Sequence, residues 1–328
     1  MWLADNWTDY ELLDCSCGEK LERWGRYTLV RPDPQVIWKT PKEHPGWRRP
    51  DARYERSQSG GGRWHRGIVP DRWQIGYGEL CGSLGGNAGE KHIAGSGEKH
   101  IAGSGEKHIA GPLDKARLCF NVSLMNFKHT GLFPEQAVNW EFIAGMVRSA
   151  GRVGVGSASA VSVLNLFAYT GGATLAAASA GATVCHVDAA RGMVSRAKEN
   201  AASSGLGDKP IRWIVDDCFK FVEREARRGR KYDAIIMDPP AFGRGPSGEV
   251  WKLEDGLYDF VKLCAGVLSD DPLFVLVNSY TTGLSPSTLT YITQSLLGGH
   301  AESGEIGLPV SEGRGALPCG ATCRWTPG

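Results

Sequence analysis

The chain has 328 residues, 41% of them hydrophobic, and a formal net charge of +1, which suits one large or two modest soluble globular domains. The near-neutral charge indicates no particular partner, so a nucleic-acid surface would need local clusters of basic residues, and no run approaches the roughly 20 apolar residues of a membrane span. The acidic amino terminus lacks a signal pattern and the nine cysteines are scattered, which predicts a cytoplasmic protein with reduced thiols.

Residues 1–80 differ from the rest of the chain in composition. They carry seven of the eleven tryptophans. Short strand-like pieces, such as residues 26–30 and 36–38, lie between proline and glycine breaks. This pattern predicts a small antiparallel, β-rich amino-terminal domain.

The most polar part of this region is residues 39–72. Basic residues alternate there with Trp47, Tyr54 and Trp64. Basic side chains can hold phosphates and aromatic rings can stack on bases, so the segment is a candidate RNA-binding surface. The alternative interpretation is a solvated loop with no ligand.

A repeat of the eight-residue unit GEKHIAGS follows, beginning at Gly89. Its period is too short for a solenoid, and one histidine every eight residues in a glycine-rich coil does not preorganise a metal site. The flanking residues 73–80 and 118–122 alternate like strands. We therefore predict an insertion at about residues 82–117, at a hairpin tip or within one strand, and no bound metal.

From residue 122 onward the chain alternates helical and strand patterns, which predicts an α/β fold with a mostly parallel, doubly wound sheet. An antiparallel hairpin is expected at residues 305–325. The predicted strands are 161–166, 183–187, 211–215, 233–237 and 273–277, and the predicted helices are 134–150, 172–180, 190–203, 219–228, 257–268 and 286–297.

Four successive strands end in polar or glycine-containing segments. Each alone is compatible with an ordinary turn or helix cap. In a doubly wound sheet, however, the carboxyl ends of neighbouring strands converge on one crevice, so together they predict a binding site. The residues concerned are Phe167, Tyr169, Gly171, Asp188, Asp217, Asp238, Pro239 and Pro240.

The glycine pattern limits the ligand of this site. A dinucleotide fingerprint needs three spaced glycines, whereas only Gly171 and Gly172 are present, and no phosphate-binding lysine follows them. A nicotinamide-dependent dehydrogenase is therefore disfavoured. S-adenosylmethionine fits better: Asp188 would hold the ribose hydroxyls, Asp217 would read the adenine amine, and the nearby aromatic rings would favour the sulfonium.

The ordered motifs NFKHTGLFPEQ, LNLFAYTGG, HVDAARG, ENAASSGL, VDDCFKFV and MDPPAFGRG resemble those of class I S-adenosylmethionine-dependent methyltransferases. More narrowly, they resemble the bacterial family that contains large-subunit ribosomal RNA methyltransferases. The resemblance implies a Rossmann-like methyltransferase domain at residues 122–328, with an antiparallel last strand, after a β-rich domain at residues 1–121.

The resemblance also implies roles for individual residues. The segment before the first helix would close over the methionine end of the cofactor, and the Asp-Pro-Pro turn would face the methyl group and the substrate. The residues implied are Lys128, Thr130, Phe133 and Gln136 in the first group, and Asp238, Pro239 and Pro240 in the second.

We thus predict methyl transfer from S-adenosylmethionine to RNA, with ribosomal RNA as the partner. The alternatives are a methyltransferase for a small molecule or protein, and a non-catalytic RNA-binding protein on the same scaffold. Residues 278–282 contain no cysteine, so carbon-5 methylation of cytosine through a cysteine nucleophile is not expected. The methylated atom and the formation of a homodimer stay open.

Overall fold

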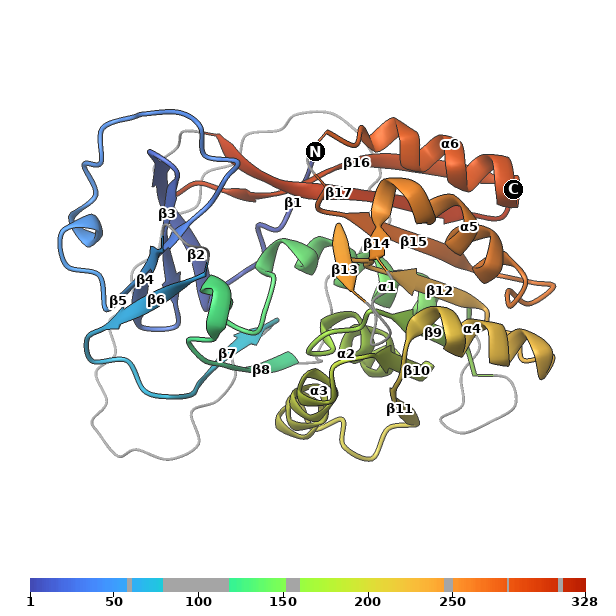
Figure 1. Cartoon of the computed structure of the whole chain (residues 1–328). Coiled ribbons are helices and arrows are strands. Elements are labelled where there is room, and N and C mark those ends of the chain that lie inside the picture. The colour runs from blue at the N-terminus through green and yellow to red at the C-terminus, as the bar shows by residue number, and fades with distance from the viewer. Residues whose placement is uncertain (58–60, 79–117, 152–159, 245–249, 282, 312–314) are drawn as a thin grey trace, which may run out of the picture.

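The computed structural model describes residues 1–57, 61–78, 118–151, 160–244, 250–281, 283–311 and 315–328. An amino-terminal β-rich part, blue in Figure 1, lies beside an α/β part built on a long sheet. The amino-terminal strands are β1 (Trp2–Leu3), β2 (Tyr10–Ser16), β3 (Glu19–Trp24), β4 (Tyr27–Pro32), β5 (Ala52–Arg56), β6 (Gly62–Arg66), β7 (Trp73–Tyr77) and β8 (Leu118–Val122).

The second part alternates helices and strands, as its sequence predicts. The helices are α1 (Ala137–Ser149), α2 (Gly172–Ser179), α3 (Arg191–Ser203), α4 (Cys218–Arg227), α5 (Leu253–Ala265) and α6 (Pro286–Leu297). The strands are β9 (Ser162–Leu166), β10 (Thr183–Asp188), β11 (Ile211–Val215), β12 (Ala234–Met237), β13 (Phe242–Arg244), β14 (Val250–Lys252), β15 (Phe274–Ser279), β16 (His300–Pro309) and β17 (Ala316–Thr326).

The large sheet has the order β1-β16-β17-β15-β12-β9-β10-β11. Strands β15, β12, β9, β10 and β11 run parallel to one another, whereas β17 runs antiparallel to both β15 and β16. Side chains of α1 and α2 pack on one face, and side chains of α4 and α5 pack on the other. The predicted doubly wound sheet with an antiparallel last strand is therefore confirmed.

The central strands read as continuous apolar runs because both of their faces are covered. Every residue of β12 and β15 is buried. Phe221 of α4 and Phe260 of α5 fill one face, and Ile143 of α1 fills the other. Burial on both faces fixes the register, and the register in turn sets which residues lie at the sheet edge.

The amino-terminal sheet has the order β2-β3-β4-β5-β6. Neighbouring strands are antiparallel except β4 and β5. The predicted strand at residues 36–38 is wrong: this segment is an extended loop, held by hydrogen bonds from Gly18 N to the Val36 carbonyl and from Cys17 N to the Trp38 carbonyl. The residue types at 36–38 favour a strand, but the segment does not pair with a neighbouring strand, so none forms.

The segments that flank the glycine-rich repeat form a hairpin, as one of the two expectations had it. β7 pairs with β8 in antiparallel register, from Trp73 opposite Val122 to Tyr77 opposite Leu118. The insertion at residues 82–117 lies outside the described residues. Trp2 and Leu3 pair with β16 of the large sheet, and the division into residues 1–121 and 122–328 stays a prediction.

Two helices begin elsewhere than predicted. The 134–150 helix starts with a 3₁₀ turn at Pro134–Gln136 before α1. Helix α5 starts four residues before the predicted 257, because buried Leu253 pairs with Leu257 one turn later and acidic Glu254 favours the first turn.

The structure also bears on the cysteines, on membrane-spanning helices and on metal-binding groups within the described residues. Seven cysteines carry free thiols, but Cys119 is disulfide-bonded, so the expectation of reduced thiols is wrong at that position. None of the described helices combines the length and apolarity needed to cross a membrane. The described residues also contain no group of three or more His, Cys, Asp or Glu side chains placed to hold a metal.

Candidate functional site

The register of the parallel strands brings the predicted strand ends together. Leu166 of β9 pairs with Val187 of β10 and with Met237 of β12, and Met237 pairs with Val277 of β15. The residue after each of these therefore stands at the same carboxyl edge of the sheet. These edge residues are Phe167, Asp188, Asp238 and Asn278.

A small cavity of about 50 Å³ opens at this edge, enough to enclose only part of a nucleoside-sized ligand. Its walls come from the turn after β9, the ends of β12 and β15, and the segment that leads into α1. Half of the predicted site residues line it, namely Phe133, Gln136, Phe167, Tyr169, Gly171 and Asp238. Residues that lie about a hundred positions apart in sequence thus meet in one cavity.

The turn between β9 and α2 is strained and tightly packed. Phe167 and Tyr169 adopt φ values of 55° and 49°, a region that non-glycine residues rarely occupy. Gly171 has φ 90°, and a Cβ at Gly172 would lie 2.7 Å from the ring of Trp140. Such strain persists only where the surroundings enforce it and it clusters at ligand sites, so the turn is a prebuilt wall of the cavity.

Asp188 holds this turn in place. Its two carboxylate oxygens accept hydrogen bonds from Tyr169 N and Ala190 N, each at 2.8 Å. Burial raises the pKa of Asp188, and the two backbone hydrogen bonds oppose that shift. Each oxygen keeps a further lone pair, so the carboxylate can still accept two hydroxyl groups at the strand end.

Asp217 caps helix α4. Its Oδ1 accepts a hydrogen bond from Lys220 N at 3.0 Å. The next residue, Cys218, accepts one from Phe167 N through its sulfur at 3.3 Å, which ties this helix start to the strained turn. Asp217 is thus a helix cap beside the cavity, and Oδ2 is the atom that could face a ligand.

A second carboxyl group, which sequence reasoning did not assign to the site, acts electrostatically on Asp238. Burial and nearby Glu135 raise the pKa of Asp238 to about 7. Glu135 lies in the 3₁₀ turn before α1, is 5% exposed, and has its own pKa raised by burial. The sequence assigned Glu135 only a helix-dipole role, because nothing local shows that its charge acts on Asp238.

A buried amide network orients Gln136 in the cavity wall. Gln136 donates from Nε2 to the Tyr280 hydroxyl at 2.8 Å. Its Oε1 accepts from Asn139 at 3.0 Å and from Asn278 at 3.3 Å. Asn139, Asn278 and Tyr280 are further residues that sequence reasoning missed, although the position of Asn278 at the end of a predicted strand was an available signal.

The Asp-Pro-Pro turn continues into an aromatic hairpin. Pro239 is buried, and the Pro240 carbonyl accepts a hydrogen bond from Trp251 Nε1 at 2.6 Å. Phe242 on β13 is 54% exposed. A large apolar ring therefore stands in solvent a few residues beyond Asp238.

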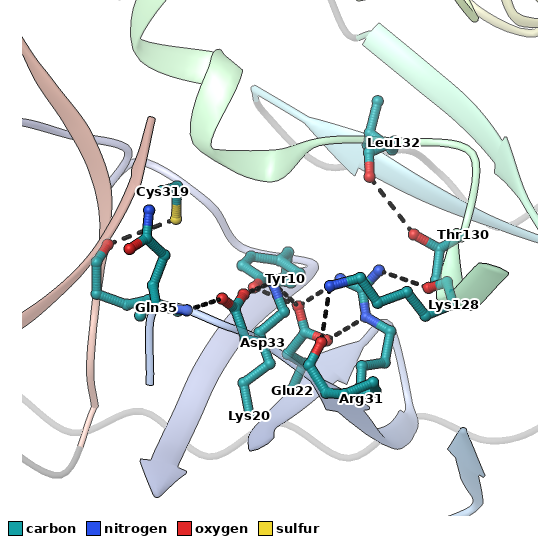
Figure 2. Close-up of polar contacts among 12 residues, drawn as sticks. Tyr10, Lys20, Glu22, Arg31, Asp33, Gln35, Lys128, Thr130, Leu132 and Cys319 are labelled. Carbon is teal, nitrogen blue, oxygen red and sulfur yellow. Dashed lines mark hydrogen bonds and ion pairs between the residues drawn. The ribbon is translucent and has the colours of Figure 1, made fainter. Parts of the chain in front are cut away.

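Lys128 and Thr130 do not line the cavity. Lys128, with φ 65°, donates from Nζ to the Pro32 carbonyl at 2.9 Å, and its own carbonyl accepts from Arg31 Nη1 at 3.0 Å (Figure 2). The Thr130 hydroxyl donates to the Leu132 carbonyl at 3.4 Å. Burial lowers the pKa of Lys128 to about 8. The loop above the cavity is therefore bound to strand β4 of the amino-terminal sheet.

Arg31 is itself fixed by a buried charge network (Figure 2). Glu22 accepts two hydrogen bonds from the Arg31 guanidinium, at 2.6 and 2.7 Å, and a third from the Tyr10 hydroxyl at 2.8 Å. Lys20 lies between Glu22, at 3.6 Å, and Asp33, at 3.2 Å. The network connects the amino-terminal sheet to the cavity loop through Arg31.

The predicted RNA-binding segment keeps its charge but not its stacking rings. Trp47 and Tyr54 are 6% and 4% exposed and belong to the core, and half-buried Trp64 donates to the Met125 carbonyl at 2.7 Å. The prediction that these rings stack on bases is therefore wrong for Trp47 and Tyr54. The exposed basic side chains of the segment are Lys39, Arg48, Arg49, Arg56, Arg63, Arg66 and Arg72.

Comparison with known proteins agrees with this geometry. A family model described as S-adenosylmethionine-dependent methyltransferase matches residues 109–252. A crystal structure of the SAM-dependent methyltransferase from Agrobacterium tumefaciens is 33% identical with a TM-score of 0.79, and the match covers 100% of this chain and 93% of that one. A Streptococcus mutans protein, 17% identical over 98% of this chain and 76% of its own, shares the fold with a TM-score of 0.65.

Two ribosomal RNA methyltransferases also match part of the chain. Ribosomal RNA large subunit methyltransferase K/L of Shewanella pealeana is 32% identical over 48% of this chain, and methyltransferase I of Aeromonas salmonicida is 32% identical over 37%. The matches span 19% and 28% of the lengths of those relatives.

Proposed function

Because this chain belongs to the S-adenosylmethionine-dependent methyltransferases, we propose that it transfers a methyl group from S-adenosylmethionine to a base of large-subunit ribosomal RNA. The observation that carries this proposal is the position of Asp238. Its carboxyl group lines the cavity next to the strained turn of Phe167 and Tyr169, where a proton acceptor would be needed. A ribosomal RNA substrate would also fit a cytoplasmic protein.

The hydrogen-bond acceptors at the sheet edge suit an adenosyl sulfonium. Asp188 has lone pairs left for ribose hydroxyls, and Asp217 Oδ2 is available to the adenine amine. The rings of Phe133 and Tyr169, with centroids 5.5 Å apart, offer faces to a cation. A diphosphate would instead be repelled by the negative charges of the Asp188 and Asp238 carboxylates. When bound, S-adenosylmethionine supplies an electrophilic methyl carbon.

The remaining predicted residues either bind the cofactor or shape the loop above it. Gln136, oriented by its amide network, binds the methionine end, and Gly171 allows close approach of the backbone. Lys128 and Thr130 shape the loop above the cavity rather than contact the cofactor, since both side chains bond to backbone carbonyls.

Asp238 has the chemistry of a proton acceptor for the substrate. A base N–H would donate a hydrogen bond to its carboxylate, which orients the nitrogen lone pair in line with the methyl carbon. As the new N–C bond forms and the S–C bond breaks, the proton of that nitrogen moves to Asp238. Pro239 and Pro240 follow the carboxylate at the end of β12, and exposed Phe242 lies four residues beyond it on β13.

The choice of RNA rests on two observations. The partial relatives are named as ribosomal RNA methyltransferases, and exposed basic side chains gather on one segment of the amino-terminal part. The direct test uses the full chain, methyl-labelled S-adenosylmethionine and unmodified large-subunit ribosomal RNA, followed by mass spectrometry of the digested nucleosides. We expect one labelled nucleoside; label found only in proteins or small molecules of a cell extract would contradict the proposal.

Replacing Asp188 with alanine should weaken S-adenosylhomocysteine binding by about ten- to a hundredfold, because two hydroxyl acceptors and the backbone support of Tyr169 are lost together. Isothermal titration calorimetry measures the effect. The matched control is Asp208→Ala, which removes an exposed carboxylate from the loop after α3 and should leave the affinity unchanged. Equal affinities for the two variants would refute the ribose assignment.

A further inference from the structure

A second cavity lies on the outer side of Tyr169. It has a volume of about 530 Å³, within the roughly 300–1,000 Å³ of small-ligand sites. One wall is the loop after β8, with Met125, Asn126 and His129, and the other is the first half of α3, with Met193 and Arg196. We call this cavity the α3 groove.

The α3 groove and the cavity at the sheet edge, called the acceptor cavity from here on, share a wall residue. Tyr169 lines both. Phe133, in the wall of the acceptor cavity, lies 5.5 Å from Tyr169 and 5.8 Å from His129 between ring centroids, and Tyr280 lies 5.6 Å from Phe133 on its other side. Neighbouring nucleotides bound in the two cavities would thus both contact aromatic side chains.

The groove also carries a positive charge that is not neutralised within the described residues. Arg196 donates to the Ser123 hydroxyl at 2.8 Å and to the Met125 sulfur at 3.4 Å, and both acceptors are uncharged. These bonds hold the guanidinium at the groove wall. Burial lowers the pKa of His129, so its ring is neutral at pH 7 and Arg196 is the cation of the groove.

The remaining wall atoms suit a flat, polarisable group. Met125 and Met193 offer thioethers, Tyr169 and His129 offer ring faces, and Asn126 offers an exposed amide. Stacking faces combined with one cation are the features by which proteins hold a nucleotide of single-stranded RNA.

We propose that the α3 groove binds the nucleotide next to the methylated base, with its phosphate at Arg196 and its base against Tyr169 and Met193. This inference rests on the proposed action on RNA and adds a subsite to it. The groove selects single-stranded RNA, because an adjacent nucleotide must be unstacked to enter it while the target base enters the acceptor cavity.

The test measures binding of a fluorescent single-stranded RNA of mixed sequence, about 12 nucleotides long, by anisotropy, and of S-adenosylhomocysteine by calorimetry. Arg196→Gln and Met193→Ala should each raise the RNA Kd by about five- to tenfold and change the S-adenosylhomocysteine Kd by less than about twofold. Arg196→Gln should also reduce the slope of log Kd against log salt by about 0.7, the value for one phosphate contact. The matched control is Lys198→Gln, an exposed cation on the same helix outside the groove.

The outcomes are separable. If the unaltered protein binds RNA and Arg196→Gln behaves like Lys198→Gln, the groove proposal is overturned while the proposed function stands. A loss of S-adenosylhomocysteine affinity without loss of RNA affinity would assign the groove to the cofactor and also overturn it. If the unaltered protein binds no RNA, the proposed function fails, and the groove proposal fails with it. Circular dichroism melting of each variant confirms that the fold is kept.

Discussion

Replacing Asp238 with asparagine is expected to lower the rate of methyl transfer to RNA by about 10²–10⁴-fold, because the amide keeps the shape of the side chain but cannot take the proton of the acceptor. The rate is measured at saturating labelled cofactor, above the pKa of Asp238. S-adenosylhomocysteine binding should change little, since Asp238 faces the acceptor side of the cavity. Such a split between turnover and cofactor affinity would separate a proton acceptor from a purely structural turn residue.

The pH dependence gives the same proposal a second readout. Asp238 must be deprotonated to accept a proton, and its pKa is about 7. Below that value the rate of the unaltered enzyme should therefore rise about tenfold per pH unit, and above it the rate should level off. Glu135→Gln removes the neighbouring negative charge, lowers the pKa of Asp238 and shifts the rising limb to lower pH.

The matched control for Asp238 is Asp259→Asn, which changes an exposed carboxylate on α5. This variant should keep both the rate and the pH profile of the unaltered protein. If Asp238→Asn is as active as Asp259→Asn above neutral pH, Asp238 is a turn residue and the acceptor proton leaves to water.

The sequence was sufficient for the fold of the second half because local pattern and tertiary burial agree there. Strand β12 and strand β15 are apolar throughout, and both are buried on two faces. Parallel pairing then forces their next residues, Asp238 and Asn278, to one edge. A rule about strand ends was therefore enough to predict four residues of the cavity wall, Phe167, Tyr169, Gly171 and Asp238.

What escaped prediction depends on contacts between distant segments. Glu135 and Asp238 are a hundred positions apart, and nothing local shows that they meet. Lys128 was expected to face the cofactor, but its ammonium points to Pro32 of the amino-terminal sheet. Composition likewise could not show that Trp47 of the basic segment is buried, because an aromatic ring among charges reads the same in a core as on a surface.

The charge network that anchors the cavity loop could not be predicted from the sequence either, because nothing in the strand-like segments around Glu22 and Arg31 shows that the two side chains pair. Glu22 is completely buried. Burial alone would raise its pKa, but Arg31 and Lys20 outweigh that effect and lower the pKa to about 2. Folding stability from this carboxylate is therefore present above its unfolded pKa of about 4.3 and is lost as pH falls towards 2.

Glu22→Gln should lower the free energy of unfolding of the amino-terminal sheet by about 3–5 kcal/mol, because Arg31 and Lys20 would be left as buried cations without a full counter-charge. Urea unfolding, followed by tryptophan fluorescence, measures the loss, because seven of the eleven tryptophans lie in residues 1–80. The control is Glu11→Gln, which breaks the half-exposed pair with Arg23 on the same sheet and should cost less than about 1 kcal/mol.

The same variant tests whether the network acts on the site. Arg31 holds the Lys128 carbonyl, so an Arg31 freed from Glu22 should loosen the loop above the cavity and weaken S-adenosylhomocysteine binding, whereas Glu11→Gln should not. Equal stability losses for Glu22→Gln and Glu11→Gln would mean that water reaches the buried pair. A stability loss without any change in affinity would mean that the loop is held by Thr170 from the methyltransferase side instead.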